Sequence, residues 1–188
     1  MLRDRLLLEY ETIQTSNFES FETLTKLLIS GEDHRFYYHF GFDIIAILRA
    51  FRNRLIYDKI EGASTIEQQL IRVLTNDFER TLRRKIQEIL LSTTIASIIP
   101  KSSIPKVYLN IAYYGSDMNG LNQTFLKLKL NITDKISLDQ AAEIVSRIKY
   151  PEKLKQNKQR LTQIEIRKKH LIQLYNKHST RRYFKIYA

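Results

Sequence analysis

The chain contains no cysteine, which excludes disulfide bonds and thiolate metal sites. It has only 5 glycines and 3 prolines in 188 residues, a composition that argues against a loop-rich β fold. It also lacks a long apolar run, because residues 89–100 are interrupted by hydroxyl side chains and are too short to span a bilayer. No secretory signal is evident, since charged residues closely flank the short run Leu6, Leu7 and Leu8. We therefore expect an all-α, mostly helical protein that is soluble or attached to a membrane surface.

Basic residues outnumber acidic ones, and their excess gathers near the C-terminus. The net charge is +11, and residues 151–188 hold 11 Lys and Arg against 2 Asp and Glu. Nucleic-acid phosphates and anionic membrane surfaces both attract such a segment. No base-reading motif accompanies it, so we expect no nucleic-acid partner. We predict attachment to an anionic membrane surface, with four aromatic residues at the interface: Tyr175, Tyr183, Phe184 and Tyr187. A solvated basic helix without a dedicated partner is the alternative.

Apolar residues recur at helical spacing through most of the chain. The pattern predicts helices over residues 18–30, 43–57, 79–99, 137–151 and 154–177, one beginning at residue 64 and one at residue 105. No strand-like alternation persists beyond a few residues. We divide the chain into a domain of residues 1–151 and a basic helical extension of residues 152–188.

Three details of these helices are specific enough to test. Gly31 should end the helix over residues 18–30, which leaves Glu32 just beyond it. Ser64 and Glu67 match the capping box of a helix N-terminus, as do Ser137 and Gln140. The helix over residues 79–99 should turn an apolar stripe inward that includes Leu82, Ile86 and Ile89.

Residues 31–43 place two carboxylates beside aromatic side chains. Glu32 and Asp33 precede a cluster of Phe36, Tyr37, Tyr38, Phe40 and Phe42. Aromatic walls remove water from a carboxylate, which suits it to act as a general base. The alternative is that one of the two carboxylates caps a helix or pairs with Arg35.

Residues 62–70 place polar donors on one helix face. Thr65, Gln69 and Arg72 lie at i, i+4 and i+7, with Gln68 at the edge of that face. The helix N-terminus near Ser64 adds free N–H groups and the positive end of the helix dipole, which suits a phosphate. The alternative is a well-capped surface helix.

Residues 80–88 combine a carboxylate with several cations. Arg80, Arg84 and Glu88 lie at i, i+4 and i+8, and a pair between Arg84 and Glu88 stabilises a helix by only about 0.2–0.5 kcal/mol. The basic residues of 80–85 exceed what one carboxylate needs, and the excess suits a diphosphate. The three segments together describe a site for a sugar diphosphate, in which one carboxylate takes a proton from an attacking hydroxyl.

At these residues the chain resembles the peptidoglycan glycosyltransferases of family 51, the transglycosylase module of penicillin-binding proteins and of monofunctional polymerases. A Glu-Asp-x-x-Phe-x-x-His-x-Gly motif is met by Glu32, Asp33, Phe36, His39 and Gly41. Residues 62–70 meet Gly-Ala-Ser-Thr-x-x-Gln-Gln-Leu, and Arg84, Lys85 and Glu88 meet Arg-Lys-x-x-Glu. A fourth motif, Tyr-Leu-Asn-x-x-Tyr-x-Gly, is met by Tyr108, Leu109, Asn110, Tyr113 and Gly115. The resemblance covers residues 21–151.

The resemblance implies a lysozyme-like large helical lobe, a small membrane-facing jaw, and polymerisation of lipid II into a growing glycan strand. Undecaprenyl diphosphate is released with inversion at the anomeric carbon. Glu32 matches the general base, and Glu88 matches a second carboxylate that assists at the donor diphosphate, directly or through a divalent cation. Substrate binding is implied for Asp33, Phe36, His39, Ser64, Thr65, Gln68, Gln69, Arg72, Arg80, Arg84, Lys85 and Asn110.

The same resemblance implies a metal and a location. Glu88 is the candidate metal ligand, and magnesium or manganese suits a carboxylate–phosphate site. The family works at the outer face of the cytoplasmic membrane. We therefore expect a peripheral protein at the extracytoplasmic face, although this chain shows no signal or transmembrane segment.

The chain departs from the family pattern at several positions. Arg72 replaces a usual Lys, Val73 a usual Asn and Ile111 a usual Glu, and the segment after Gly115 lacks Tyr-Phe-Gly-Lys. These departures keep open a non-catalytic module that binds the lipid diphosphate. A muramidase-like hydrolase is a further alternative, but cleavage of a neutral glycan requires no diphosphate clamp.

Overall fold

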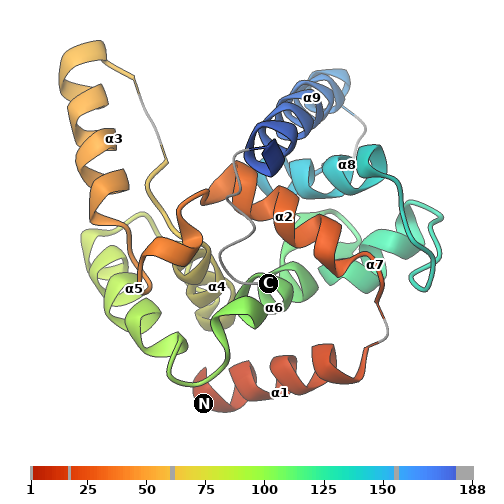
Figure 1. The fold of residues 1–188 in the computed structure, drawn as a ribbon, viewed down its shortest axis with the longest axis horizontal. Helices are drawn as coiled ribbons and strands as arrows, with labels where there is room; N and C mark the ends of the chain where they lie inside the picture. Colours follow the sequence, from red (N-terminus) through yellow and green to blue (C-terminus); the bar gives the residue numbers. More distant parts are fainter. Residues whose placement is uncertain (1, 17, 60–61, 155–156, 181–188) are drawn as a thin grey trace.

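The structure is a computed structural model that describes residues 2–16, 18–59, 62–154 and 157–180. This part of the chain is mostly helical, as predicted from the sequence (Figure 1). Its helices are α1 (Leu2–Thr15), α2 (Phe21–Glu32), α3 (Ile44–Tyr57), α4 (Ile66–Thr75), α5 (Leu82–Ile95), α6 (Ile104–Ile111), α7 (Gly120–Lys127), α8 (Leu138–Lys149) and α9 (Lys158–Thr180). Short 3-10 turns, η1 (Phe36–Tyr38) and η2 (Lys101–Ser103), join some of them. Within the described ranges, no helix has both the length and the apolar character that crossing a bilayer requires.

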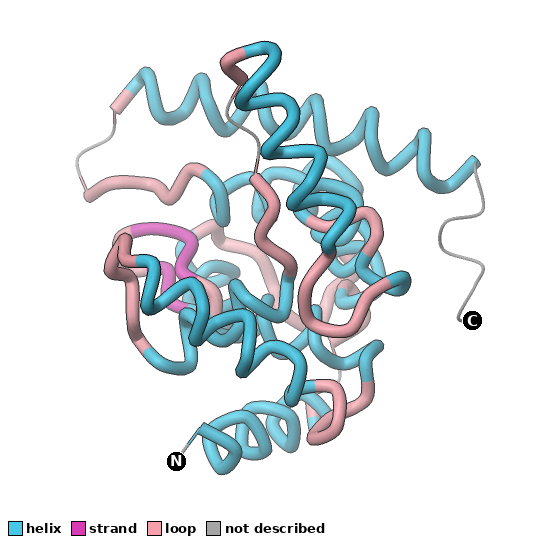
Figure 2. Tube along the Cα trace, turned by 90° about the vertical axis from the view of Figure 1, so that its left-hand side faces the viewer, coloured by secondary structure: helices cyan, strands magenta, loops and turns pink. Residues whose placement is uncertain are grey.

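One small sheet interrupts the helices. Strands β1 (Tyr113–Gly115) and β2 (Met118–Asn119) pair antiparallel, with Tyr113 opposite Asn119 (Figure 2). Gly115 also bridges to Glu152 in parallel, which ties the sheet to the segment after α8. The strands are too short to have been visible as alternation in the sequence.

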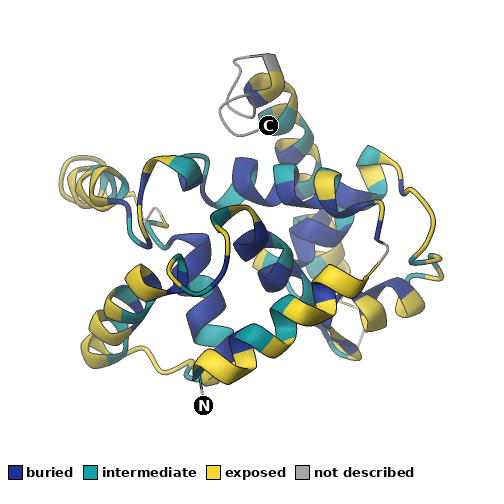
Figure 3. Cartoon of the chain, turned by 60° about the horizontal axis from the view of Figure 1, so that its bottom comes forward, coloured by how far each residue is buried: buried dark blue, intermediate teal, exposed yellow. Residues whose placement is uncertain are grey.

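The core forms where α2 and α6 meet their neighbours. Helix α2 packs against α6, α8 and α9, and α6 packs against α1, α4 and α7. Leu24, Leu27 and Leu28 of α2 are completely buried, as are Val107 and Leu109 of α6. The three leucines of α2 are three or four residues apart, and they form the apolar stripe that the sequence predicted for residues 18–30. Figure 3 shows the buried residues concentrated on these central helices.

The capping box at Ser137 is confirmed. The Ser137 hydroxyl accepts a hydrogen bond from the Gln140 amide at 3.2 Å, and the Ser137 amide donates to Gln140 Oε1 at 2.9 Å. These two bonds satisfy backbone donors at the start of α8, whose buried face includes Ile144 and Val145.

Gly31 does not end α2, contrary to the prediction. The helix continues to Glu32, and Asp33 is its C-cap. A Cβ atom built on Gly31 would lie 2.2 Å from Leu171 Cδ2 of α9. Gly31 therefore allows α9 to approach α2 closely, and its position inside a helix reflects packing rather than termination.

The prediction of a capping box formed by Ser64 and Glu67 is also wrong. Thr65 is the N-cap of α4, and its hydroxyl accepts from the Gln68 amide. Glu67 does not reach back to the backbone, because its carboxylate is bonded to Lys101, 34 residues further along the chain. A local motif could not reveal this distant partner.

Helix α5 faces the opposite way from the prediction and is shorter than expected. Leu82 is 77% exposed and Ile86 is 52% exposed, whereas Glu88, Ser92 and Ile95 are buried. The helix packs against α4 through this partly polar face. Leu82 and Ile86 of the predicted stripe therefore point away from the core, whereas Ile89 is half-buried.

Helix α3 has no buried residue at all. It projects from the body at the upper left of Figure 1, and Figure 3 shows it, at the left, as mostly exposed. Its exposed apolar side chains are Ile44, Ile45, Ile47, Leu48, Phe51, Leu55, Ile56 and Tyr57. Asp43 caps the helix by accepting from the amides of Ile45 and Ala46. Since α3 contributes nothing to the core, its exposed apolar surface indicates an interaction site.

Helix α9 packs on α2 and α8. Leu171 is completely buried, and Lys168 bonds to Asp139 of α8 at 3.0 Å. Tyr175 is half-buried against the core, while Tyr183, Phe184 and Tyr187 lie outside the described residues. The division at residue 151 and the membrane role of residues 152–188 stay predictions.

Candidate active site

Gly41 joins the first polar segment to the second and also packs against α5. Its carbonyl accepts a 2.6 Å hydrogen bond from the Thr65 hydroxyl at the start of α4. Its φ is +85°, and a Cβ atom built there would lie 2.5 Å from the Ser92 carbonyl of α5. Only glycine combines this left-handed conformation with so close an approach. The loop of residues 39–43 is thus held between α4 and α5.

Asp33 and His39 anchor α4 to the end of α2. His39 Nε2 lies 3.0 Å from Asp33 Oδ2, and the Ile66 amide donates to the same carboxylate oxygen at 3.2 Å. Both side chains are buried. Asp33 therefore does cap a helix, but a distant one, and Arg35 pairs with Asp43 at 2.8 Å instead of with Glu32 or Asp33.

Buried Glu67 forms an ion pair with the partly exposed Lys101, and the sequence did not reveal this pair. Burial raises the pKa of Glu67, and the neighbouring Lys101 opposes that shift. Lys101 also donates to the His39 carbonyl at 2.9 Å and lies 4.1 Å from the centre of the Phe36 ring. Donor atoms of Asp33, His39 and Glu67 lie within 4.8 Å of one another, but Lys101 supplies the positive charge there. The cluster therefore has a structural role, because Lys101 connects the loop at His39 to Glu67 of α4.

Glu88 lies at the centre of a cationic cluster. Its carboxylate, 2% exposed, accepts from Arg72 Nε at 2.7 Å and from Arg72 Nη2 at 3.3 Å. Arg84 of the preceding turn bonds to it as well, and Lys85 Nζ lies 3.6 Å away. Three cations around one carboxylate leave positive charge in excess, which suits an anionic ligand. The intrahelical pair with Arg84 exists but is one part of this larger cluster.

Lys85 connects the cationic cluster to the start of α4. Its ammonium group donates to Ser64 Oγ at 3.0 Å and to Gln68 Oε1. Burial lowers the pKa of Lys85, and Glu88 opposes this shift. The second and third segments thus meet through one side chain.

Glu32 lies on the other side of the site, at the end of α2. Its Oε1 accepts from Arg167 Nη2 of α9 at 2.8 Å. Burial raises the pKa of Tyr108 well above its usual range, and the negative charge of Glu32 adds to the shift while Arg72 opposes it. Tyr108 donates to Gln69 Oε1 at 2.8 Å. Tyr108 therefore lies within electrostatic reach of both Glu32 and Arg72.

A small pocket of about 20 Å³, room for about one water molecule, opens beside Glu32. It runs from the end of α2 to the loop before α4 and the first turns of α3, and it is lined by Glu32, Asp33, His34, Arg35, Asp43, Ala46, Arg49, Gly62, Ala63, Ser64 and Thr65. Glu88 is not among these residues. The two carboxylates therefore do not share this pocket wall, and Glu88 reaches it only through Lys85 and Ser64.

The other predicted binding residues have varied surroundings. Phe36 and Gln68 are completely buried, so they shape the site from within the core. Arg80 is exposed and precedes the first turn of α5. Asn110 donates to Glu9 of α1 at 3.1 Å, and that bond is to none of the predicted site residues. The substrate-binding roles stay predictions.

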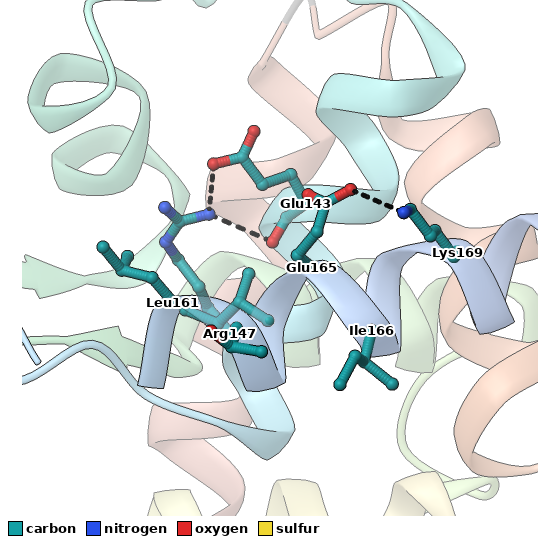
Figure 4. Close-up of a pocket in the computed structure, with 8 residues that line it drawn as sticks. Glu143, Arg147, Leu161, Glu165, Ile166 and Lys169 are labelled. Carbon is teal, nitrogen blue, oxygen red and sulfur yellow. Dashed lines mark hydrogen bonds and ion pairs between the residues drawn. The ribbon is translucent and has the colours of Figure 1, made fainter. Parts of the chain in front are cut away.

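A second pocket, between α8 and α9, lacks the excess of positive charge found around Glu88. Arg147 bonds to Glu143 at 2.9 Å, and Lys169 lies 3.9 Å from Glu165 (Figure 4). Its charged side chains therefore satisfy one another, and none of the residues singled out in the sequence lines it.

The surroundings of Glu88 do not favour a divalent cation. Both of its oxygens already accept from cationic side chains, and in the described part of the chain it belongs to no group of three carboxylate or imidazole ligands. A bare metal ion would have to displace Arg72 or Arg84. Magnesium or manganese at this residue stays a prediction.

Sequence reasoning missed Tyr108 and Arg167 as parts of the site. Tyr108 belongs to the fourth motif, which gave a signal that it matters but not where it lies. Arg167 stands in a basic helix where nothing distinguishes it from neighbouring Lys and Arg residues. Its partner, Glu32, is 135 residues away.

Comparison with known proteins gives consistent matches. Penicillin-binding protein 1A of Aquifex aeolicus is 37% identical over 133 residues, covering 70% of this chain and 18% of that protein. The biosynthetic peptidoglycan transglycosylase of Thiobacillus denitrificans is 33% identical over 129 residues, covering 68% of this chain and 56% of that protein. The monofunctional glycosyltransferase of Staphylococcus saprophyticus is 34% identical over 130 residues, covering 65% and 48%.

The chain thus spans less than a fifth of the first of these relatives and about half of the other two. Residues 8–176 match the family described as Transglycosylase, which covers α1 to α9 almost entirely. The four motifs that the fold brings together all lie inside that match. This chain belongs to the transglycosylase family.

Proposed function

We propose that the protein polymerises lipid II into glycan strands and releases undecaprenyl diphosphate. One observation carries the proposal: a partly exposed carboxylate, Glu32, lines the same small pocket as Ser64, whose hydroxyl accepts a hydrogen bond from Lys85 of the cationic cluster. A base on one side and a diphosphate site on the other are what glycosyl transfer from a diphosphate donor requires.

In this proposal Glu32 is the general base. It accepts the proton of the acceptor's 4-hydroxyl while that oxygen attacks the anomeric carbon of the donor. The bond from that carbon to the diphosphate oxygen breaks, and the electron pair leaves with the diphosphate. Attack from the face opposite the leaving group inverts the anomeric centre. The side chain of Glu32 is 17% exposed, so a substrate hydroxyl can reach it.

Arg72, Arg84 and Lys85 stabilise the departing diphosphate in the same proposal. Negative charge increases on the leaving group as the bond breaks, and cations held in place beforehand stabilise that charge without reorganising. Glu88 assists by holding these cations together, since its carboxylate bonds to all of them. Its assistance is therefore proposed to be indirect.

Incubation of the protein with labelled lipid II in detergent tests the function. We expect glycan polymer and free undecaprenyl diphosphate. Binding of lipid II without polymer, with magnesium or manganese present, would contradict the proposal and support the non-catalytic module. Adding a chelator, and then either metal, tests the predicted cation separately.

We further propose that α3 and the exposed side of α5 lie in the lipid interface of an anionic membrane, at its extracytoplasmic face. Eight exposed apolar side chains of α3 lie beside Arg49, Arg52 and Arg54 of the same helix. Leu82, Ile86 and Leu90 of α5 are exposed at successive turns. Apolar side chains next to cations are typical of helices that lie in a lipid interface. A lipid-linked substrate also requires the site to stand close to a bilayer.

Replacing Leu48, Phe51 and Leu55 together with serine should weaken binding to anionic vesicles by at least about tenfold. Each of these side chains contributes on the order of 1–2 kcal/mol when it leaves water. Co-sedimentation with vesicles of anionic and neutral lipid measures the effect. Leu126→Ser is the matched control, because Leu126 is 80% exposed and belongs to α7, which lies on the opposite side of Figure 1 from α3. Equal losses in both variants would contradict the assignment.

A further inference from the structure

We propose that Arg167 of α9 is a positioning residue for Glu32, so that the basic C-terminal helix contributes to the reaction itself. This inference rests on the proposed function of Glu32. It concerns a residue outside the four motifs, on an element for which the sequence suggested only attachment to a membrane.

The geometry around Arg167 is specific. One nitrogen, Nη2, donates to Glu32 Oε1 at 2.8 Å and to the Gly31 carbonyl at 2.7 Å. That nitrogen carries two hydrogens, so each acceptor receives one of them. The carboxylate is therefore fixed relative to the backbone carbonyl of the residue before it. A surface ion pair would lack this second attachment.

The packing around the pair holds Arg167 in place. Its side chain is only 10% exposed. Leu171, one turn further along α9, packs where a side chain at position 31 would otherwise stand. Because Leu171 is completely buried, it could not easily move aside. The absence of a side chain at Gly31 and the position of Arg167 are thus parts of one contact between α2 and α9.

This contact leaves one carboxylate oxygen for chemistry. Glu32 Oε1 is bonded to Arg167, while Oε2 has no hydrogen-bond partner among the described residues. A general base needs a free oxygen aimed at the substrate and little freedom to turn away from it. The Gly31 carbonyl is also one of the last backbone acceptors of α2, which Arg167 satisfies at the same time.

The test compares Arg167→Gln and Arg167→Lys with the wild-type protein. We expect the glutamine variant to lower kcat on lipid II by on the order of tenfold to a hundredfold with little change in KM, because the base is present but misaligned. Lysine keeps the charge without the fork geometry and should give an intermediate rate. Millimolar guanidinium, compared with sodium at equal ionic strength, should partly restore Arg167→Ala.

Arg147→Gln is the matched control. Arg147 is a buried arginine of α8 bonded to Glu143 and Glu152, and it does not contact Glu32. It should lower the unfolding temperature without changing kcat. If Arg167→Gln behaves in the same way, Arg167 is merely structural and the inference is overturned.

A double-mutant cycle adds a readout that needs no activity. Glu32→Gln and Arg167→Gln should be coupled by about fivefold in the unfolding equilibrium constant. Independent effects of the two changes would overturn the inference. If the wild-type protein makes no polymer, the proposed function fails and the role of Arg167 falls with it. If only the inference is wrong, the wild-type protein stays active and the Arg167 variants match it in kcat.

Discussion

Replacing Glu32 with glutamine is expected to reduce polymerisation of lipid II by at least about 10²-fold, because general-base catalysis typically contributes that much or more. Glutamine has nearly the same shape as glutamate, and its Oε1 still accepts from Arg167, but the amide cannot take up the proton of the acceptor hydroxyl. Polymer formed from labelled lipid II measures the loss. The unfolding temperature, measured in parallel, should change by only a few degrees.

The exposed carboxylate of Glu22 provides the matched control. It lies on the same helix, α2, and pairs with Lys26 near the opposite end from Glu32. Glu22→Gln should polymerise at the wild-type rate. A Glu32→Gln protein that still makes polymer at that rate would remove the proposed base, whatever the identity of the substrate.

Replacing Glu88 with glutamine should both destabilise the protein and slow the reaction. Removing one partner of a buried ion pair typically costs about 3–5 kcal/mol. Here the cations are partly hydrated, with up to about a third of the Lys85 side chain exposed, so we expect on the order of 2 kcal/mol. Arg72 and Arg84 would then repel each other and lose their fixed positions, and turnover should fall on the order of a hundredfold. Urea unfolding and lipid II kinetics measure the two effects.

Glu152→Gln separates the two effects of the Glu88 change. Glu152 bonds to buried Arg147 at 3.0 Å, so its loss should also destabilise the protein, but it lies outside the cationic cluster. It should leave turnover unchanged at temperatures where the protein is folded. If Glu88→Gln loses only stability and keeps its turnover, Glu88 has no part in the reaction.

Helix α5 illustrates how far a local pattern reaches. Its spacing correctly predicted a helix and the pair between Arg84 and Glu88. It also suggested that Leu82 and Ile86 face the core, and this was wrong. An apolar stripe indicates a surface that avoids water, but it does not say whether protein or lipid covers that surface. Only the burial of Glu88, Ser92 and Ile95 in the folded protein shows which side is inside.

The predictions for Gly31 and Glu67 were wrong for a related reason. Each was interpreted with its neighbours in sequence, Gly31 as a helix end and Glu67 as part of a capping box. Leu171 and Lys101 explain them better, and both lie far along the chain. Side chains of this kind respond to long-range contacts that no window of a few residues contains.

The sequence by itself determined most of the helices, though not α1 and α7, together with the polar segments that carry the chemistry and the gathering of positive charge near Glu88 and the C-terminus. Periodicity, capping and charge are local properties, so they can be deduced before any fold is known. Only the tertiary structure decided which side chains meet: Arg72 with Glu88, Tyr108 with Gln69, and Arg167 with Glu32. Hydrogen bonds and ion pairs act over a few ångströms, and only packing brings residues that are tens of positions apart within that range.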